Sequence, residues 1–159
     1  MDFLTGKEIR LEQLLPLIEE TLRKGNTVKF SPRGISMLPM LRQGKDTVTL
    51  SPVVHELKKY DIPLYRRDNG AFVLHRIVEV GDTLTCIGDN QYDLERGIRR
   101  DQVIGVVTAF TRDGKTVLVS DLRYRLYCRL WNWSRPARRF WRRAKGFLIR
   151  KWQKFIAHK

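Results

Sequence analysis

The chain has few cysteines and no long apolar run. Cys86 and Cys128 are its two cysteines, too few for the dense disulfide network of a small secreted module. No stretch approaches the roughly 20 apolar residues that a membrane-crossing helix needs. The N-terminal sequence MDFLTGKEIRLEQ also lacks the basic start and apolar run of a secretory signal. We therefore expect free thiols, no spanning helix and no export by the usual route, and nothing in the sequence calls for a metal ion or a cofactor.

Acidic residues are missing from one part of the chain. Residues 122–159 hold 13 Lys or Arg and no Asp or Glu, whereas residues 1–121 hold 18 basic and 17 acidic side chains. The net charge of +14 therefore belongs almost entirely to the C-terminal part. At 159 residues the chain can build one core of ordinary size. We predict a nearly neutral domain over residues 1–121 and a basic appendage over 122–159 that attracts anions.

The first domain begins with a helical pattern and continues with β-type runs. Leucine and isoleucine recur at helical spacing over residues 11–24, and Gly25 can end that helix. Pro16 favours a regular helix that begins nearer Leu15, because proline is tolerated in a first turn. Residues 26–120 contain short runs rich in Val, Ile, Thr, Phe and Tyr between turn residues. The sequence predicts a mainly β, α+β fold with a meandering antiparallel sheet.

The basic appendage has a helical stripe of apolar side chains that starts at Leu122. Ser134 and Pro136 divide the stripe into two expected helices, with Ser134 capping the second. Tryptophan on a basic helical frame is typical of helices that lie in a membrane interface. The expected membrane-binding residues are Trp131, Trp133, Arg138, Arg139, Trp141, Arg142, Arg143 and Trp152.

The expected partner of the appendage is an anionic membrane surface, on the cytoplasmic, inner face of the cell membrane. Nucleic acid is the alternative, because phosphates attract the same charges. Against it, the aromatic residues follow a helical stripe and form no obvious base-stacking platform. A third interpretation is that the stripe packs on the first domain or on a second copy of the chain.

The segment RGISMLPM, residues 33–40, places Ser36 between a flexible glycine and a Met-x-Pro turn. Such a serine either caps a turn or acts as a nucleophile. Its hydroxyl needs a base to accept the proton, and the base is best held by a third group. Of the three histidines, His158 is near the chain end and His55 follows a probable loop sequence, whereas His75 lies inside FVLHRIVEV, the most strand-like segment. A histidine placed there is either a structural residue with a polar partner or the base.

Acidic residues gather in the segment CIGDNQYDLERGI, residues 86–98, which contains Asp89, Asp93 and Glu95. Taken alone, this is a turn whose Asp and Asn side chains bond their own backbone. In combination, however, Ser36-Met37-Leu38-Pro39, His75-Arg76 and Gly88-Asp89-Asn90 resemble the signal peptidase I family and its wider clan, which includes the self-cleaving repressors of the DNA-damage response. The resemblance covers about residues 27–107.

That resemblance implies a serine endopeptidase that cuts a leader or another extended peptide segment. Ser36 would be the nucleophile and His75 the base. Since no lysine lies between Lys59 and Lys115, the chain is similar to the serine-histidine branch found in archaea and the endoplasmic reticulum. In that branch an acidic residue after the Gly-Asp-Asn box orients the histidine. Glu95 stands at the matching place, where the family type has Asp, so Asp93 and Asp89 are alternatives.

The expected oxyanion and substrate-binding residues are Gly34, Ser36, Met37 and Pro39. The backbone N–H of Ser36 would stabilise the oxyanion, and Gly34 would allow substrate to approach the chain closely. Proline fixes the turn, and Met37 fills the space beneath the serine. The competing hypothesis is a non-catalytic module that binds a membrane or nucleic acid, and a further one is self-cleavage of the appendage.

Overall fold

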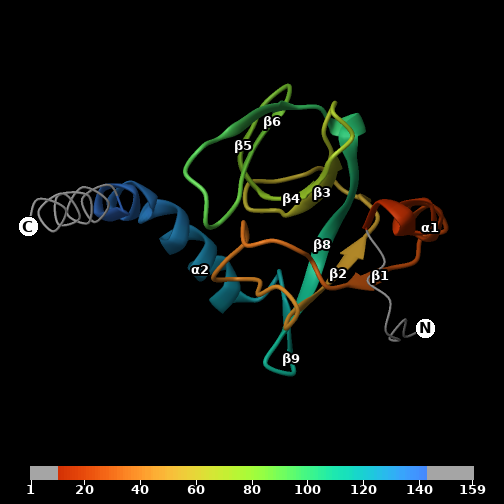
Figure 1. Ribbon diagram of the computed structural model, residues 1–159, viewed down its shortest axis with the longest axis horizontal. Coiled ribbons are helices and arrows are strands. Elements are labelled where there is room, and N and C mark those ends of the chain that lie inside the picture. The colour runs from red at the N-terminus through yellow and green to blue at the C-terminus, as the bar shows by residue number, and fades with distance from the viewer. Residues whose placement is uncertain (1–10, 143–159) are drawn as a thin grey trace, which may run out of the picture. The chain divides into compact units, whose positions relative to one another are not determined.

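The structure of the chain is a computed structural model that describes residues 11–142 (Figure 1). The chain divides into two compact units, one ending at Asp121 and one beginning at Leu122. The boundary coincides with the change in charge along the sequence.

Helix α1 (Leu11–Arg23) opens the described part of the first unit. It contains Pro16, so the helix does not begin near Leu15 as the proline suggested. Pro16 lies at an exposed position inside the helix, where its ring supplies no N–H donor. Gly25, at φ 81°, ends the helix by donating its N–H to the carbonyl of Leu22. The buried apolar face of α1 consists of Leu15, Ile18 and Leu22.

The first unit has two antiparallel sheets, so the predicted mainly β, α+β fold is confirmed. The larger sheet has six strands. In spatial order they are β1 (Val28–Phe30), β2 (Thr47–Ser51), β8 (Val103–Arg112), β3 (Pro63–Arg66) and β4 (Phe72–Leu74), with β9 (Lys115–Leu118) paired to β8. The smaller sheet contains β5 (Arg76–Val80), β6 (Leu84–Ile87) and β7 (Glu95–Ile98), followed by the short 3₁₀ helix η1 (Arg100–Gln102).

Strand β8 organises the larger sheet. Most strands pair with the next strand along the chain, as in a meander, but β8 returns to lie between β2 and β3. Figure 1 shows it as the longest ribbon of the unit, running past both. An added Cβ on Gly105 of β8 would lie 3.0 Å from Cδ1 of Leu22. The absence of a side chain at Gly105 therefore lets α1 pack closely over this strand.

An apolar core cluster joins the two sheets. Its buried members are Leu57, Tyr65, Ile77, Leu84, Cys86, Ile98 and Val106, from strands of both sheets and the loop after β2. Neither Cys86 nor Cys128 forms a disulfide, and burial raises the pKa of Cys86 to about 12. The thiol is therefore a neutral core side chain. Because Tyr65 belongs to this core, the core fixes the position of the Tyr65 hydroxyl, which is part of the site.

The segment FVLHRIVEV forms two strands, where the sequence predicted one. Phe72–Leu74 is β4 of the larger sheet, Arg76–Val80 is β5 of the smaller sheet, and His75 lies between them. The chain changes sheets here, and Ile77 exchanges backbone hydrogen bonds with the loop before β3 through Tyr60 and Asp61. His75 is therefore held at the junction of the two sheets.

The second unit begins with helix α2 (Leu122–Trp133), and residues 135–142 are helical again. The predicted division of the appendage into two helices is therefore an interruption of one residue, Ser134. Ser134 does not cap the second helix with its side chain, because its hydroxyl donates to the carbonyl of Trp131. Helical backbone bonds continue through Ser134 on both sides. None of the helices in the described part of the chain combines the length and hydropathy needed to cross a bilayer.

Candidate active site

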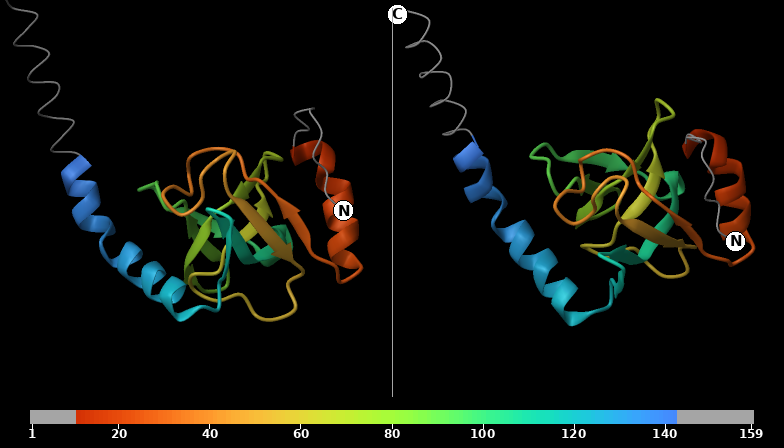
Figure 2. Two further views of the ribbon diagram at one scale, coloured as in Figure 1. Left: turned by 90° about the horizontal axis from the view of Figure 1, so that it is seen from below. Right: turned by 60° about the horizontal axis from the view of Figure 1, so that its bottom comes forward.

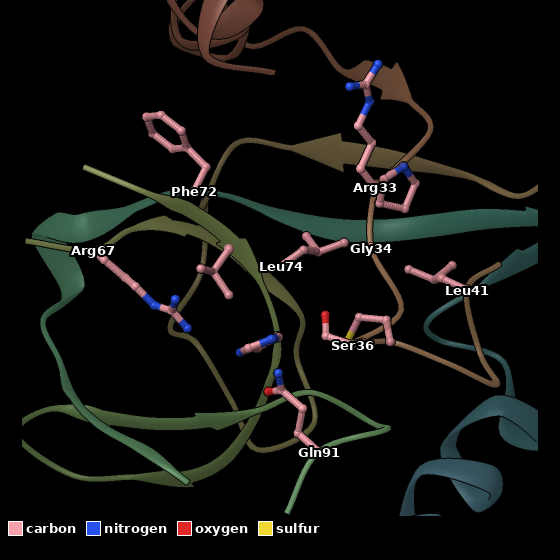
Figure 3. A pocket seen from close by; sticks show the side chains of 12 residues that line it. Arg33, Gly34, Ser36, Leu41, Arg67, Phe72, Leu74 and Gln91 are labelled. Atoms are coloured by element: carbon pink, nitrogen blue, oxygen red, sulfur yellow. The ribbon is translucent and has the colours of Figure 1, made fainter. Parts of the chain in front are cut away.

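A pocket of about 190 Å³ brings together the serine segment and the histidine. Ser36, Gly34 and Met37 line it from the loop between β1 and β2, a loop drawn in orange in Figure 2. His75 and strand β4 line it from the other side. Figure 3 shows the labelled side chains of Ser36 and Gln91 facing the same space. Two of the predicted catalytic residues, 39 positions apart in sequence, thus share one cavity.

The loop geometry displays Ser36 at the surface of the unit. Gly34 has φ 90°, a conformation that favours glycine, and its N–H is occupied by the side-chain carbonyl of Gln43 at 2.9 Å. Gly34 therefore lines the pocket, but its N–H already has an acceptor. Met37 is buried beneath the serine, as expected. Pro39 follows a cis peptide bond, is exposed and is not part of the pocket wall, so its contribution is to the turn.

The Gly-Asp-Asn box holds the serine loop through hydrogen bonds from Asn90. The backbone N–H of Asn90 donates to the carbonyl of Ser36 at 2.8 Å, and the side-chain amide of Asn90 donates to the carbonyl of Ile35 at 3.2 Å. An added Cβ on Gly88 would lie 2.7 Å from the carbonyl oxygen of Ser36. Glycine at position 88 is therefore required for this close approach.

A buried ion pair ties the box to the strand after His75. Arg76 donates from Nε to Asp89 at 2.8 Å and from Nη2 at 2.7 Å, and both side chains are at most 2% exposed. Arg76 also contacts the sulfur of Met40 at 3.0 Å and the carbonyl of Tyr60 at 3.3 Å. One guanidinium thus joins four segments of the chain. Asp89, one of the alternatives for the third catalytic member, is engaged in this structural pair.

Glu95 is the carboxylate that lies beside His75. Its Oε2 is 3.5 Å from Nδ1 of His75. Arg67 holds both carboxylate oxygens, from Nε at 2.5 Å and from Nη2 at 2.7 Å, and the Tyr65 hydroxyl donates to Oε2 at 2.7 Å. Burial works to raise the pKa of Glu95, but the bonds from Arg67 and Tyr65 outweigh it, so the pKa lies below its ordinary value. Asp93 is exposed, and no contact among the described residues joins it to His75.

The environment of His75 favours the neutral imidazole. Burial lowers the pKa of His75 below 6.5, while the charge of Glu95 opposes that shift. Nδ1 faces Glu95 and also lies 3.3 Å from the Tyr65 hydroxyl. A neutral ring that carries its proton on Nδ1 has a free lone pair on Nε2, the form that a general base requires.

Ser36 and His75 share the pocket without a direct bond. Within residues 11–142, no hydrogen bond joins the Ser36 hydroxyl to the His75 ring, so the expected contact near 3 Å is not formed in this structure. Such contacts are often long before substrate binds. The backbone N–H of Ser36 has no backbone acceptor in the described chain.

Sequence reasoning missed three residues of this site: Tyr65, Arg67 and Gln91. Tyr65 and Arg67 stand two residues apart at the end of β3, and strand alternation places such residues on one face. Nothing in the sequence, however, indicates that Glu95 of the other sheet faces them. The Gln91 side chain lines the pocket opposite Ser36. The sequence feature that could have indicated Gln91 is the Gly-Asp-Asn turn that directly precedes it.

The predicted membrane-binding residues lie in the second unit. Trp131 stacks on Tyr127 at 5.8 Å, and the guanidinium of Arg138 lies 3.5 Å from the Trp131 ring centre. Trp133 and Trp141 are exposed, at 82% and 71%. Arg139 and Arg142 are also exposed, whereas Arg143 and Trp152 lie outside the described residues. Over residues 11–142 we find no cluster of three or more side chains suited to a metal ion.

We compared the chain with models of protein families, with curated proteins and with solved structures, and none of them matches. The resemblance to the signal peptidase clan therefore rests on the three short segments, and the chemistry of the site is argued from its own geometry.

Replacing Asp89 with asparagine should lower the free energy of unfolding by about 3–5 kcal/mol, because Arg76 would be left as a buried charge without its counter-ion. The exposed Asp82 is the matched control, and Asp82→Asn should change stability by less than about 0.5 kcal/mol. Urea denaturation followed by circular dichroism measures both. Equal stabilities of the two variants would contradict the structural role assigned to the pair.

Proposed function

We propose that the chain is a serine endopeptidase in which Ser36 is the nucleophile, His75 the general base and acid, and Glu95 the acidic third member. One observation carries the proposal. The carboxylate of Glu95 lies 3.5 Å from Nδ1 of His75, and His75 itself lines the cavity that contains Ser36. An alcohol, an imidazole and an acid in this arrangement are the parts that acyl transfer needs.

The reaction begins when Oγ of Ser36 attacks the carbonyl carbon of a peptide bond and its proton passes to Nε2 of His75. The resulting oxyanion accepts a hydrogen bond from the backbone N–H of Ser36. When the C–N bond breaks, His75 returns the proton to the leaving amine, and an acyl ester remains on Ser36. Water then attacks the ester with His75 as base, and release of the carboxylic acid restores the serine.

The protonation state of the site supports this chemistry. A base must be unprotonated to accept the proton of Ser36, and burial keeps the pKa of His75 below 6.5. Glu95 has a lowered pKa, so it carries the negative charge that stabilises the imidazolium formed in each half-reaction. General-base help of this kind contributes about 100- to 10,000-fold to the rate.

The edge of the larger sheet supports an extended peptide as substrate. Among the strands of the described chain, β4 pairs with β3 alone, so its other side has free backbone groups. Phe72, Val73 and Leu74 of β4 line the pocket that contains Ser36. A leader or another unfolded segment can add to this edge as a strand, which brings its backbone to the serine. The resemblance implies small side chains before the cut.

We further propose that the second unit attaches the enzyme to an anionic membrane surface, on the cytoplasmic face. Leu122, Leu126, Leu130 and Trp133 share one face of α2 at helical spacing, and all are more than half exposed. The basic side chains of the unit add about 1 kcal/mol of attraction each near an anionic leaflet. Nucleic acid is less favoured, because Tyr127 and Arg138 already lie against the Trp131 ring that a base would stack on.

A fluorophosphonate probe tests the nucleophile without knowledge of the substrate. We expect the probe to label Ser36 in the full chain, no labelling at that position in Ser36→Ala, and a loss of about 100- to 10,000-fold in labelling rate in His75→Ala. Ser120 is exposed, and Ser120→Ala serves as the control that should react normally. Mass spectrometry identifies the labelled residue. Equal labelling of the chain with and without the Ser36 hydroxyl would exclude the peptidase and leave a non-catalytic binding module.

Flotation with vesicles tests the attachment. The full chain should float with phosphatidylglycerol vesicles at low salt, remain unbound with phosphatidylcholine, and dissociate as salt rises. Replacing Trp133 and Trp141 by serine should weaken flotation, whereas Leu118→Ser, an exposed site in the first unit, should not. A chain that stays unbound at low salt, or that binds DNA more tightly than vesicles, would refute membrane attachment.

A further inference from the structure

The contacts around His75 point to a role for Tyr65 that deepens, and rests on, the proposed peptidase function. We propose that Tyr65 is a positioning residue: its hydroxyl contacts both His75 and Glu95 and fixes the imidazole in the tautomer with the proton on Nδ1. Glu95 accepts the proton of this hydroxyl, and Arg67 holds Glu95 in place.

The number of protons shared by Tyr65, Glu95 and His75 sets the direction of their hydrogen bonds. A phenol has one proton to donate, and the Tyr65 hydroxyl donates it to Oε2 of Glu95 at 2.7 Å. The hydroxyl oxygen of Tyr65 also lies 3.3 Å from Nδ1 of His75. Because the tyrosine proton is already used, the oxygen can only accept from the ring. Nδ1 must then carry the imidazole proton, and Nε2 is left as the acceptor for the proton of Ser36.

The distances favour the tyrosine over the carboxylate as the direct partner of the ring. Nδ1 of His75 is 3.5 Å from Oε2 of Glu95, at the limit of a hydrogen bond, and 3.3 Å from the Tyr65 oxygen. The two rings also make an edge contact, with centroids 6.3 Å apart and planes at 65°. This contact restricts rotation of the imidazole, so the orientation of the base is set by packing as well as by the bond.

Burial keeps Tyr65 in the form that can donate. The residue is fully buried, and this desolvation, with the nearby carboxylate of Glu95, raises its pKa well above the ordinary value of 10. Loss of its proton is therefore excluded over the whole range in which a histidine titrates. The donor to Glu95 is permanent, and the direction of the bond from His75 to Tyr65 is permanent with it.

Arg67 makes the arrangement compatible with a neutral histidine. An unpaired carboxylate beside His75 would stabilise the charged imidazolium before any substrate arrived. Arg67 holds Glu95 through two bonds and itself works to lower the pKa of His75. The remaining charge that influences the ring is Asp89, which is paired with Arg76. The tyrosine can thus orient the ring while each nearby carboxylate has its own arginine.

The experiment measures the tautomer of His75 directly by ¹H–¹⁵N correlation of its ring nitrogens, at a pH where the ring is neutral. It uses full-length Ser36→Ala, in which no reaction can occur. We expect the Nδ1–H form in this parent and a shift toward the Nε2–H form when Tyr65→Phe is added. Tyr60→Phe removes a hydroxyl that has no hydrogen bond within the described chain, and it should leave the tautomer unchanged.

Two results would overturn the inference: an Nε2–H ring in the parent, or an Nδ1–H ring that Tyr65→Phe does not alter. Both are independent of turnover, so they are distinguishable from a failure of the proposed function, which would appear as absent probe labelling with the tautomer intact. In the chain with Ser36 present, Tyr65→Phe should slow probe labelling about 10- to 100-fold, part of the full contribution of a general base. Tyr60→Phe should react like the unsubstituted chain.

Discussion

The buried ion pair between Arg76 and Asp89 is the contact on which the site depends. It joins the strand that follows His75 to the turn that holds the Ser36 loop, and both partners are almost fully removed from water. Two charges in such a place are costly unless they meet with good geometry. Any movement of the turn away from the strand would separate them. The pair therefore restricts where Ser36 and His75 can lie relative to each other, although neither belongs to it.

A second ion pair between an arginine and a carboxylate lies in the same site. Arg67 and Glu95 form this pair, on the other side of the histidine. Each carboxylate near His75 thus has its own arginine, and desolvation decides the protonation of the ring. This explains how two acids can stand close to an imidazole that remains neutral. The side chain of Glu95 is long enough to reach both Arg67 and Tyr65.

Sequence reasoning predicted the parts of this arrangement that depend on local pattern. The N-terminal helix, the antiparallel β architecture and the displayed Ser36 follow from spacing, β-type runs and turn residues. It did not predict that the chain changes sheets at His75, because alternation continues across residues 72–80 as if they were one strand. Glu95, Asp93 and Asp89 could not be ranked from sequence, since the choice depends on which arginine each one meets. Tyr65 lies in β3 of the other sheet and Arg67 directly follows that strand, and no local pattern joins them to Glu95.

We propose that Ser36 and His75 act as one chemical unit. The most direct test is the rate of fluorophosphonate labelling of Ser36 as a function of pH, set beside the pKa of His75 measured by NMR on the same protein. We expect the rate to fall on acidification with a midpoint equal to the pKa of His75, below its ordinary value of 6.5, because protonation removes the base. A labelling rate that does not follow the titration of His75 would contradict it.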